Sequence, residues 1–160
     1  MRTRTPDGAN LTAQAPRRLY VIDASVVLKW VLDDEAHVEQ ARALRDACLI
    51  DGTVEFHAPE LMVYELTNAI RKAAYNTRLP LHIAEEALTT LLEAPIELHG
   101  PDPLTALGIG LRMTVSGYDA CYVALADALG VECWSGDERL VRACERPAPY
   151  VRSIGDYSTE

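Results

Sequence analysis

The sequence predicts an α/β fold whose mainly parallel central sheet of four to five strands is flanked by helices. Short apolar runs alternate with longer segments of helical period, which is the pattern of parallel strands joined by helical crossovers. The length of 160 residues suffices for one domain with a full core and is too short for two. Acidic residues follow several apolar runs, where ligands bind in sheets of this kind.

The first strand and the first two helices are expected before Gly52. Residues 19–22 form a short apolar run of the buried-strand type. Residues 25–32 and about 37–49 have the apolar period of helices, and Gly52 ends the second of them.

Prolines punctuate the middle of the chain. Pro59 and Pro80 each suit the first turn of a helix, because the missing N–H of proline has no partner to lose there. The predicted segments are a strand over 54–57, a helix from Pro59 to about residue 75, a helix from Pro80 that ends before Pro95, and a strand over 96–99.

The last third of the chain completes the alternation. Gly130 is a good stop at the end of a helix, because glycine readily adopts the left-handed conformation needed there. The predicted segments are helices over 103–113 and 118–129, a strand over 131–134, a helix from Asp137 to about residue 144 and an edge strand over 150–152.

The ends of the chain are expected to lie outside the folded unit. Residues 1–18 contain prolines and a glycine without a hydrophobic period, which predicts a flexible N-terminal tail. A single domain is expected over 19–157, with a C-terminal tail at 158–160. The sequence contains no apolar run of the roughly 20 residues needed to cross a membrane. It also lacks a secretory signal, so we expect a cytoplasmic protein.

The net charge of −9 disfavours unassisted nucleic-acid binding, because neutralised phosphates supply most non-specific affinity. Basic residues nevertheless cluster locally, so a groove with basic walls and a set of solvated helix faces both stay open. The four cysteines form no CxxC pair and no zinc-like spacing, and they are expected to be reduced. The basic residues concerned are Arg71, Lys72, Arg78, Arg139, Arg142, Arg146 and Arg152.

Four acids are candidates for a shared site: Asp23, Glu65, Asp119 and Asp137. Three of them also have a structural explanation. Asp119 and the segment after Ser135 fit the S-x-x-[DE] capping box, and Asp23 is placed to cap the next helix. Glu65 is different, because it lies in a polar row with Asn68 and Lys72 beside the apolar stripe of its helix.

Taken together, the four acids predict a metal centre. Two carboxylates at about 4 Å repel each other by around 4 kcal/mol at an effective dielectric near 20, and a divalent cation removes that cost. Ligands that are all oxygen favour Mg²⁺ or Mn²⁺ over zinc. One or two such ions activate water and stabilise the leaving oxygen of a phosphodiester.

The ordered segments around these acids resemble the motifs of PIN-domain ribonucleases. They are Val21-Ile22-Asp23-Ala24-Ser25, Glu65 with Asn68, Tyr118-Asp119-Ala120 with the following apolar residues, and Trp134-Ser135-Gly136-Asp137-Glu138. The resemblance covers about residues 19–157 and is greatest to the VapC-type toxins of type II toxin–antitoxin systems. It implies a PIN-like three-layer fold.

The resemblance also implies roles. Asp23, Glu65, Asp119 and Asp137 would be the catalytic, metal-binding acids, supported by Ser25, Asn68 and Ser135. The implied activity is Mg²⁺- or Mn²⁺-dependent endoribonuclease cleavage of RNA, with one or two ions. The implied assembly is a homodimer inhibited by a VapB-type antitoxin. Trp30 is expected in the core, and His57 is expected to be a satisfied structural histidine.

Two other functions compete with this one. A catalytically inactive PIN-like module would bind RNA or protein without cutting, and the complete set of four acids argues against it. A phosphoryl-handling domain of the receiver or dehalogenase type would carry a D-x-D nucleophile, but Ala24 and Ser25 follow Asp23.

Overall fold

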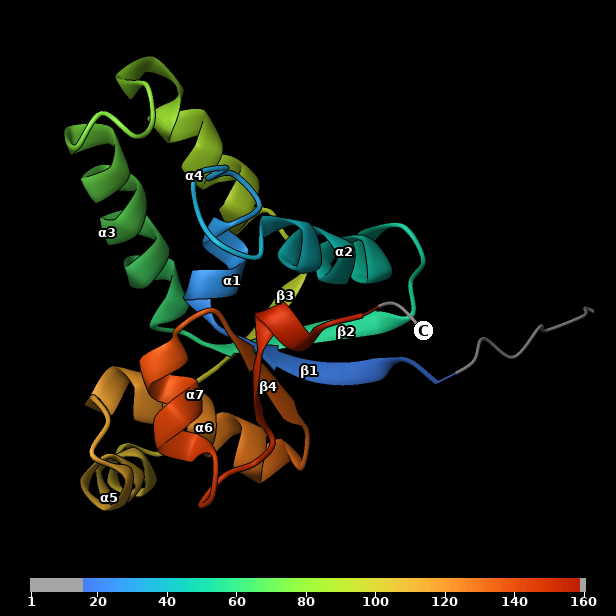
Figure 1. The fold of residues 1–160 in the computed structure, drawn as a ribbon, viewed down its shortest axis with the longest axis vertical. Coiled ribbons are helices and arrows are strands. Elements are labelled where there is room, and N and C mark those ends of the chain that lie inside the picture. The colour runs from blue at the N-terminus through green and yellow to red at the C-terminus, as the bar shows by residue number, and fades with distance from the viewer. Residues whose placement is uncertain (1–15, 159–160) are drawn as a thin grey trace, which may run out of the picture.

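The computed structural model describes residues 16–158, in which a five-stranded sheet has helices on both faces (Figure 1). The predicted N-terminal tail falls mainly on residues 1–15, outside the described residues, while Arg18 already belongs to the first strand. The predicted C-terminal tail also lies outside the described residues, except for Ser158.

The strands lie in the order β3-β2-β1-β4-β5, and all four neighbouring pairs are parallel. The predicted parallel α/β sheet is therefore confirmed, with five strands. Their bounds are β1 Arg18–Ile22, β2 Val54–Pro59, β3 Ile96–His99, β4 Glu132–Ser135 and β5 Val151–Ser153.

The strand order reverses its direction between β1 and β4. From β1 the chain adds β2 and β3 on one side, and then crosses over to add β4 and β5 on the other. Such a switch point leaves a crevice beyond the carboxyl ends of the two central strands, where ligands bind in open α/β sheets. Asp23 lies at this point, and its backbone N–H donates to Trp134 O at 3.0 Å.

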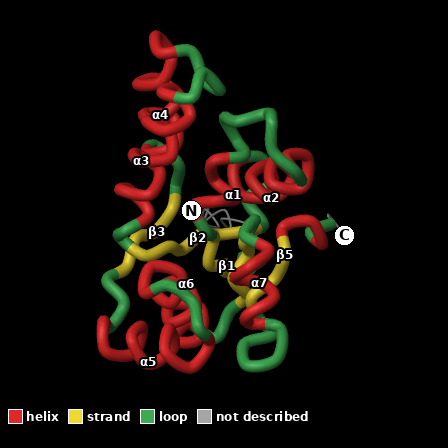
Figure 2. Tube along the Cα trace, turned by 60° about the vertical axis from the view of Figure 1, so that its left-hand side comes forward, coloured by secondary structure: helices red, strands yellow, loops and turns green. Residues whose placement is uncertain are grey.

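The helices form a layer on each face of the sheet. In Figure 1, α1 to α4 lie on one side of the strands and α5 to α7 on the other, which is the predicted three-layer arrangement. Figure 2 shows α3 and α4 as a pair that projects from the sheet. The bounds are α1 Ala24–Leu28, α2 Val38–Leu49, α3 Met62–Tyr75, α4 Ala84–Leu92, α5 Pro103–Met113, α6 Gly117–Leu129 and α7 Glu138–Cys144, with short 3₁₀ helices at Leu81–Ile83 and Ile154–Asp156.

The prediction that Pro59 opens a helix is wrong. Pro59 ends β2 opposite His99, and α3 begins only at Met62. A proline disfavours the helical conformation in the residue before it, so the extended chain continues through Ala58 to Pro59. The following residue restores the ladder, because Glu60 N donates to His99 O at 2.8 Å.

Other boundaries differ by smaller amounts. The first helix ends at Leu28 rather than at residue 32, because the next residues form turns with hydrogen bonds to the third residue back, such as Trp30 N to Val27 O. Pro80 precedes a 3₁₀ turn, and the α-helix follows at Ala84. Both β4 and β5 begin and end one residue later than predicted.

The core lies between the sheet and its two helical layers. Trp30 is buried as predicted and packs against Phe56 of β2, while its indole N–H donates to Ala41 O at 3.0 Å. Within residues 16–158, none of the helices combines the length and the apolar character that a membrane span requires. The four cysteines are free thiols, as expected.

Candidate active site

Asp23 is the buried centre of the predicted site, with 7% of its surface exposed. It follows β1 directly in extended conformation and caps α1, which confirms the predicted capping role. Burial raises the pKa of Asp23 above its usual range, hydrogen bonds from Ser135 and Ser25 lower it, and the charge of Asp119 raises it again. The protein therefore places a carboxylate where a positive charge is needed to hold it ionised.

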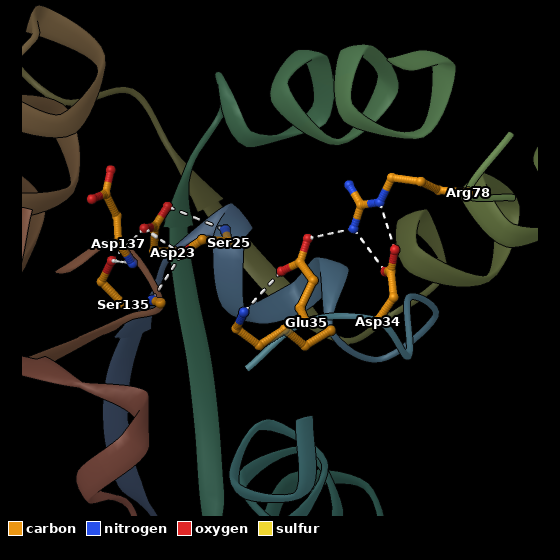
Figure 3. Close-up of polar contacts among 9 residues, drawn as sticks. Asp23, Ser25, Asp34, Glu35, Arg78, Ser135 and Asp137 are labelled. Atoms are coloured by element: carbon orange, nitrogen blue, oxygen red, sulfur yellow. Dashed lines mark hydrogen bonds and ion pairs between the residues drawn. The ribbon is translucent and has the colours of Figure 1, made fainter. Parts of the chain in front are cut away.

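Two serines hold the same oxygen of Asp23. Ser25 Oγ donates to Asp23 Oδ2 at 2.7 Å, and Ser135 Oγ donates to it at 2.6 Å (Figure 3). Each hydroxyl also accepts a backbone N–H, from Gly136 at 2.8 Å and from Asp137 at 3.0 Å respectively. The two accepted bonds direct both hydroxyl hydrogens at Oδ2, while Oδ1 accepts the Ser25 backbone N–H at the long distance of 3.5 Å and has lone-pair capacity left for another partner.

Glu65 lies in the first turn of α3 and is held by Tyr122 of α6, whose hydroxyl donates to Glu65 Oε2 in a short hydrogen bond. Burial raises the pKa of Glu65 to about 7. The Tyr122 bond opposes this rise, whereas the charges of Asp23 and Asp119 add to it. A carboxyl group in this state exchanges its proton near neutral pH.

Asp119 lies in the first turn of α6, where Ser116 Oγ accepts its backbone N–H at 3.0 Å. The predicted Ser116 cap is thus present, and the half-buried carboxyl group of Asp119 is not needed for it. Its charge acts on both Asp23 and Glu65. These three acids, from β1, α3 and α6, therefore share one electrostatic environment.

Asp137 is linked to Asp23 through Ser135, whose hydroxyl accepts the Asp137 backbone N–H. The cap of α7 is not the residue that the capping box predicted. Ser135 ends β4 and binds Asp23, so it is not the cap of α7. Asp137 is the cap instead, and its Oδ1 accepts from Arg139 N at 2.8 Å and Leu140 N at 3.3 Å. The second carboxylate oxygen, Oδ2, takes no part in these bonds.

We call Asp23, Glu65, Asp119 and Asp137 the acidic ring. The charges of Asp23, Glu65 and Asp119 act on one another, and Asp137 is linked to Asp23 through Ser135. Among residues 16–158, no three of them bring carboxylate oxygens within 4.8 Å of one another. Mg²⁺ commonly binds through one or two carboxylates while it keeps several of its waters, so a wide acidic ring fits a hydrated ion. The oxygen-only donor set, the burial of Asp23 and the raised pKa of Glu65 all fit a divalent cation.

Asn68 lies one helical turn beyond Glu65 on α3, and its side chain is exposed. Lys72 is also exposed, so the predicted row on α3 runs from the half-buried Glu65 to an amide and an amine that face solvent. This position suits contact with a long ligand across the mouth of the site. Arg78, from the same basic cluster, is ion-paired with Asp34 at 2.7 Å and with Glu35 at 3.0 Å (Figure 3).

Three supporting residues escaped sequence reasoning: Tyr122, Lys29 and Gly136. A buried tyrosine needs a partner for its hydroxyl, and Tyr122 follows Asp119 by one helical turn, which was the available signal. Lys29 is 4% exposed and is neutralised by Glu35, with Nζ 2.8 Å from Oε2. A buried cation needs such a partner.

Gly136 lies where α1 and the turn after β4 approach most closely. A Cβ at this position would lie 2.8 Å from Lys29 Cε and 3.3 Å from Ser25 Oγ. Lys29 therefore packs directly behind the turn that carries Ser135 and Asp137. No motif in the sequence indicates this contact, because it joins residues more than a hundred positions apart.

Comparison with known proteins yields one family. The family model for the PIN domain matches residues 20–146. Ribonuclease VapC12 from Mycobacterium tuberculosis is 30% identical over 125 residues, which cover 78% of this chain and 92% of that relative.

Two solved structures share the fold. PAE2754 from Pyrobaculum aerophilum has a TM-score of 0.64 and 18% identity, and the match covers 86% of this chain and 90% of that chain. VapBC2 from Rickettsia felis, solved bound to a DNA fragment from its promoter, has a TM-score of 0.56 and 9% identity, with 84% and 96% covered. At these identities the two structures establish the fold alone.

Proposed function

The chain belongs to the PIN domain family. We propose that it is a Mg²⁺- or Mn²⁺-dependent endoribonuclease that hydrolyses RNA phosphodiester bonds. The proposal is supported chiefly by Asp23 at the switch point between β1 and β4, whose carboxyl group shares its electrostatic environment with Glu65 and Asp119. The name of the relative VapC12, a ribonuclease, supports the same reaction.

Asp23, Glu65, Asp119 and Asp137 would hold one or two cations in this account. When bound, the ion lowers the pKa of water and neutralises charge on the phosphodiester. Ser25 and Ser135 both donate to Oδ2 of Asp23, so Oδ1, which accepts only the long bond from Ser25 N, would be the atom that binds the ion. Tyr122 occupies Oε2 of Glu65, so Oε1 is the atom that binds the ion or takes a proton from the attacking water.

The surroundings of the acids would bind the RNA. Asn68 and Lys72 are exposed on α3 beyond Glu65, where they can reach a phosphate or a base. The remaining charge of the chain is negative, so the metal and these few groups would provide most of the attraction for the substrate. A single-stranded or looped RNA fits this narrow basic contact better than a long duplex does.

We further propose that the chain is the toxin of a toxin–antitoxin pair, inhibited by a VapB-type antitoxin, and that it forms a homodimer. Dimerisation is supported by α5, where Leu104, Leu107 and Leu111 recur at helical spacing and are 77%, 56% and 75% exposed. An antitoxin that contributes a basic side chain would satisfy the acidic ring. The predicted cytoplasmic location agrees with this role.

The test is cleavage of a structured RNA with exposed loops by the purified chain. We expect products with Mg²⁺ or Mn²⁺ and none with EDTA. Asp23→Asn and Asp119→Asn should each lower the rate at least 100-fold while the circular dichroism spectrum stays unchanged. Asp127→Asn is the matched control, because Asp127 is an exposed acid at the other end of α6.

The alternative function, an inactive PIN-like module, predicts a different pattern. Such a module would bind RNA equally well with and without Mg²⁺, and Mg²⁺ would not raise its melting temperature. Cleavage that is equal in EDTA and in Mg²⁺ would disprove the metal-dependent mechanism.

A further inference from the structure

A second group of metal-ligating side chains lies on the sheet, apart from the acidic ring. It consists of His57 on β2 and of Glu97 and His99 on β3, and the ligand atoms of all three lie within 4.8 Å of one another. His57 pairs with Glu97 in the parallel register, and His99 follows two residues later on the same face of β3. Two adjacent strands thus carry the cluster.

The neighbouring residues on β2 and β3 show which face of the sheet carries the cluster. Phe56 packs against Trp30, with ring centroids 5.9 Å apart, so the alternating side chain of His57 points to the opposite face. Leu98 packs near Met62 and Leu91 of the α3–α4 layer, so Glu97 and His99 point away from that layer as well. The cluster therefore lies on the side of the sheet covered by α5 and α6.

The three side chains lie close enough together to share one ion. His57 Nδ1 and His99 Nε2 form a hydrogen bond of 2.9 Å, which a bound ion would replace. His57 Nδ1 lies 3.9 Å from Glu97 Oε2, and His99 Nε2 lies 3.6 Å from Glu97 Oε1. Ligands at about 2.0–2.1 Å from a tetrahedral zinc ion lie roughly 3.3 Å apart. Small side-chain rotations would bring all three atoms to that separation.

The other ring nitrogen of His57, Nε2, bears on how the ring would be oriented for a ligand on Nδ1. His57 is 4% exposed, and its buried Nε2 lacks a hydrogen-bond partner within the described residues. Glu55 Oε1 lies 3.6 Å from His57 Nε2. A histidine that binds a metal through Nδ1 must carry its hydrogen on Nε2, and it commonly donates that hydrogen to a carboxylate.

We propose that His57, Glu97 and His99 form a binding site for a zinc-class transition-metal ion, with Glu55 orienting His57. The two imidazoles and one carboxylate are the ligand types that zinc accepts, and three protein ligands leave a fourth position open. Glu97 has 60% of its side chain exposed, so an ion can enter from solvent. The bound ion clamps the edge strand β3 to β2.

This site differs from the acidic ring in the ion it selects. Imidazole nitrogen favours Zn²⁺, Co²⁺ and Ni²⁺, whereas a ring made of carboxylates favours Mg²⁺ and Mn²⁺. The proposal does not depend on nuclease activity, because it rests on side chains that the proposed reaction does not use.

The test is titration of the full chain with Zn²⁺, followed by calorimetry and thermal melting, in wild type and in Glu97→Gln and His99→Gln. We expect one tight site per chain in wild type. At about 100 times Kd, the ion should raise Tm by roughly 5–10 °C. Each variant should weaken binding at least tenfold, and Glu55→Gln should weaken it by about 10–100-fold.

Control variants outside the cluster test whether Zn²⁺ binds at His57, Glu97 and His99 and not elsewhere. His82→Gln removes an exposed histidine outside the cluster and should bind Zn²⁺ like wild type. Asp119→Asn damages the acidic ring and should also leave Zn²⁺ binding unchanged. Co²⁺ should give the visible spectrum of a tetrahedral site without a thiolate charge-transfer band, because no cysteine belongs to the cluster.

Glu97 is exposed, so the Glu97→Gln variant keeps the proposal testable if the histidine variants fold poorly. Failure of wild type to bind Zn²⁺ would overturn the proposal. Unchanged affinity in folded Glu97→Gln, or a thiolate band with Co²⁺, would place the ion elsewhere and would overturn it equally.

Discussion

Glu65 holds a carboxyl group for which burial favours the neutral form, while the Tyr122 hydroxyl favours the charged form. Burial is the larger influence, so its pKa rises to about 7. A cation bound by Glu65 would require the ionised carboxylate, so it would have to displace a proton below that pH. As a ligand, Glu65 would therefore make metal binding sensitive to pH in the physiological range.

We predict that Mg²⁺ raises the melting temperature much more at about pH 8 than at about pH 5.5, because Glu65 is ionised only at the higher pH. Glu65→Gln should remove most of this pH dependence. The measurement is thermal melting with Mg²⁺ and with EDTA across the pH range. Equal Mg²⁺ stabilisation at both pH values would argue against Glu65 as a ligand.

The same residue affects the metal-free protein in the opposite direction. The folded state holds the Glu65 proton more tightly than the unfolded chain does, so stability falls as pH rises from the ordinary value of 4.5 to about 7. In EDTA, Glu65→Gln should therefore gain stability over wild type through that window, and the gain should stay constant above it. Thermal melting in EDTA of the two proteins checks this sign.

The hydroxyl of Tyr122 is the second largest influence on the pKa of Glu65, after burial. Tyr122→Phe removes the hydroxyl that donates to Glu65, and a hydrogen bond to a charged group is worth about 1.5–3 kcal/mol. We expect the pKa of Glu65 to rise further, so the pH at which cleavage reaches half its maximum should move upward. A pH–rate profile that matches wild type would show that the bond does not tune Glu65.

At the scale of elements, the turn between β4 and α7 is fixed against α1. Gly136 donates its N–H to Ser25 Oγ at 2.8 Å, while Lys29 fills the space where a Cβ would lie. The turn therefore positions Ser135 and Asp137 only while position 136 lacks a side chain. Lys29 cannot move away freely, because it is buried and paired with Glu35.

We predict that Gly136→Ala lowers cleavage at least tenfold, because the new methyl group pushes Lys29 or the turn and shifts Ser25 against Asp23. Gly117→Ala is the matched control, since a Cβ at the start of α6 meets nothing within 4 Å. Cleavage rates and melting temperatures of both variants provide the comparison. Wild-type activity in Gly136→Ala would show that this close approach has no functional role.

The sequence predicted the elements well wherever local chemistry marks them. β1 appears as a short apolar run, β2 and β3 begin with alternating apolar and polar residues, and Gly130 ends α6 in left-handed conformation as expected. Pro59 misled the prediction, because a proline suits both a helix start and a strand end. Only the pairing of Pro59 with His99 on a distant strand decides between the two.

The site was predictable in part for the same reason. Asp23 and Asp137 follow apolar runs, so their place at strand ends could be inferred from the sequence. The bond between Tyr122 and Glu65 and the packing of Lys29 behind Gly136 join distant segments, and they depend on how the layers assemble. His57 is satisfied as predicted only at Nδ1, which is hydrogen-bonded to His99 Nε2 at 2.9 Å, whereas its Nε2 has no hydrogen-bond partner among the described residues.

At the scale of the whole molecule, the reversal of strand order brings these contributions together. β1 supplies Asp23, β4 leads to Asp137, and α3 and α6 contribute Glu65 and Asp119 from opposite layers of the sheet. The acids come from four separate segments, so only the folded chain brings Asp23, Glu65 and Asp119 within electrostatic reach of one another. A divalent cation bound among them would relieve their repulsion.

Replacing one carboxylate ligand by a thiolate shows whether these acids bind the cation directly. We predict that Asp119→Cys loses cleavage in Mg²⁺ and regains at least tenfold of it in Mn²⁺ or Cd²⁺, because a thiolate prefers softer ions. Wild type in the same ions provides the reference. Cleavage by Asp119→Cys in Mg²⁺ at the wild-type rate would show that Asp119 does not bind the cation.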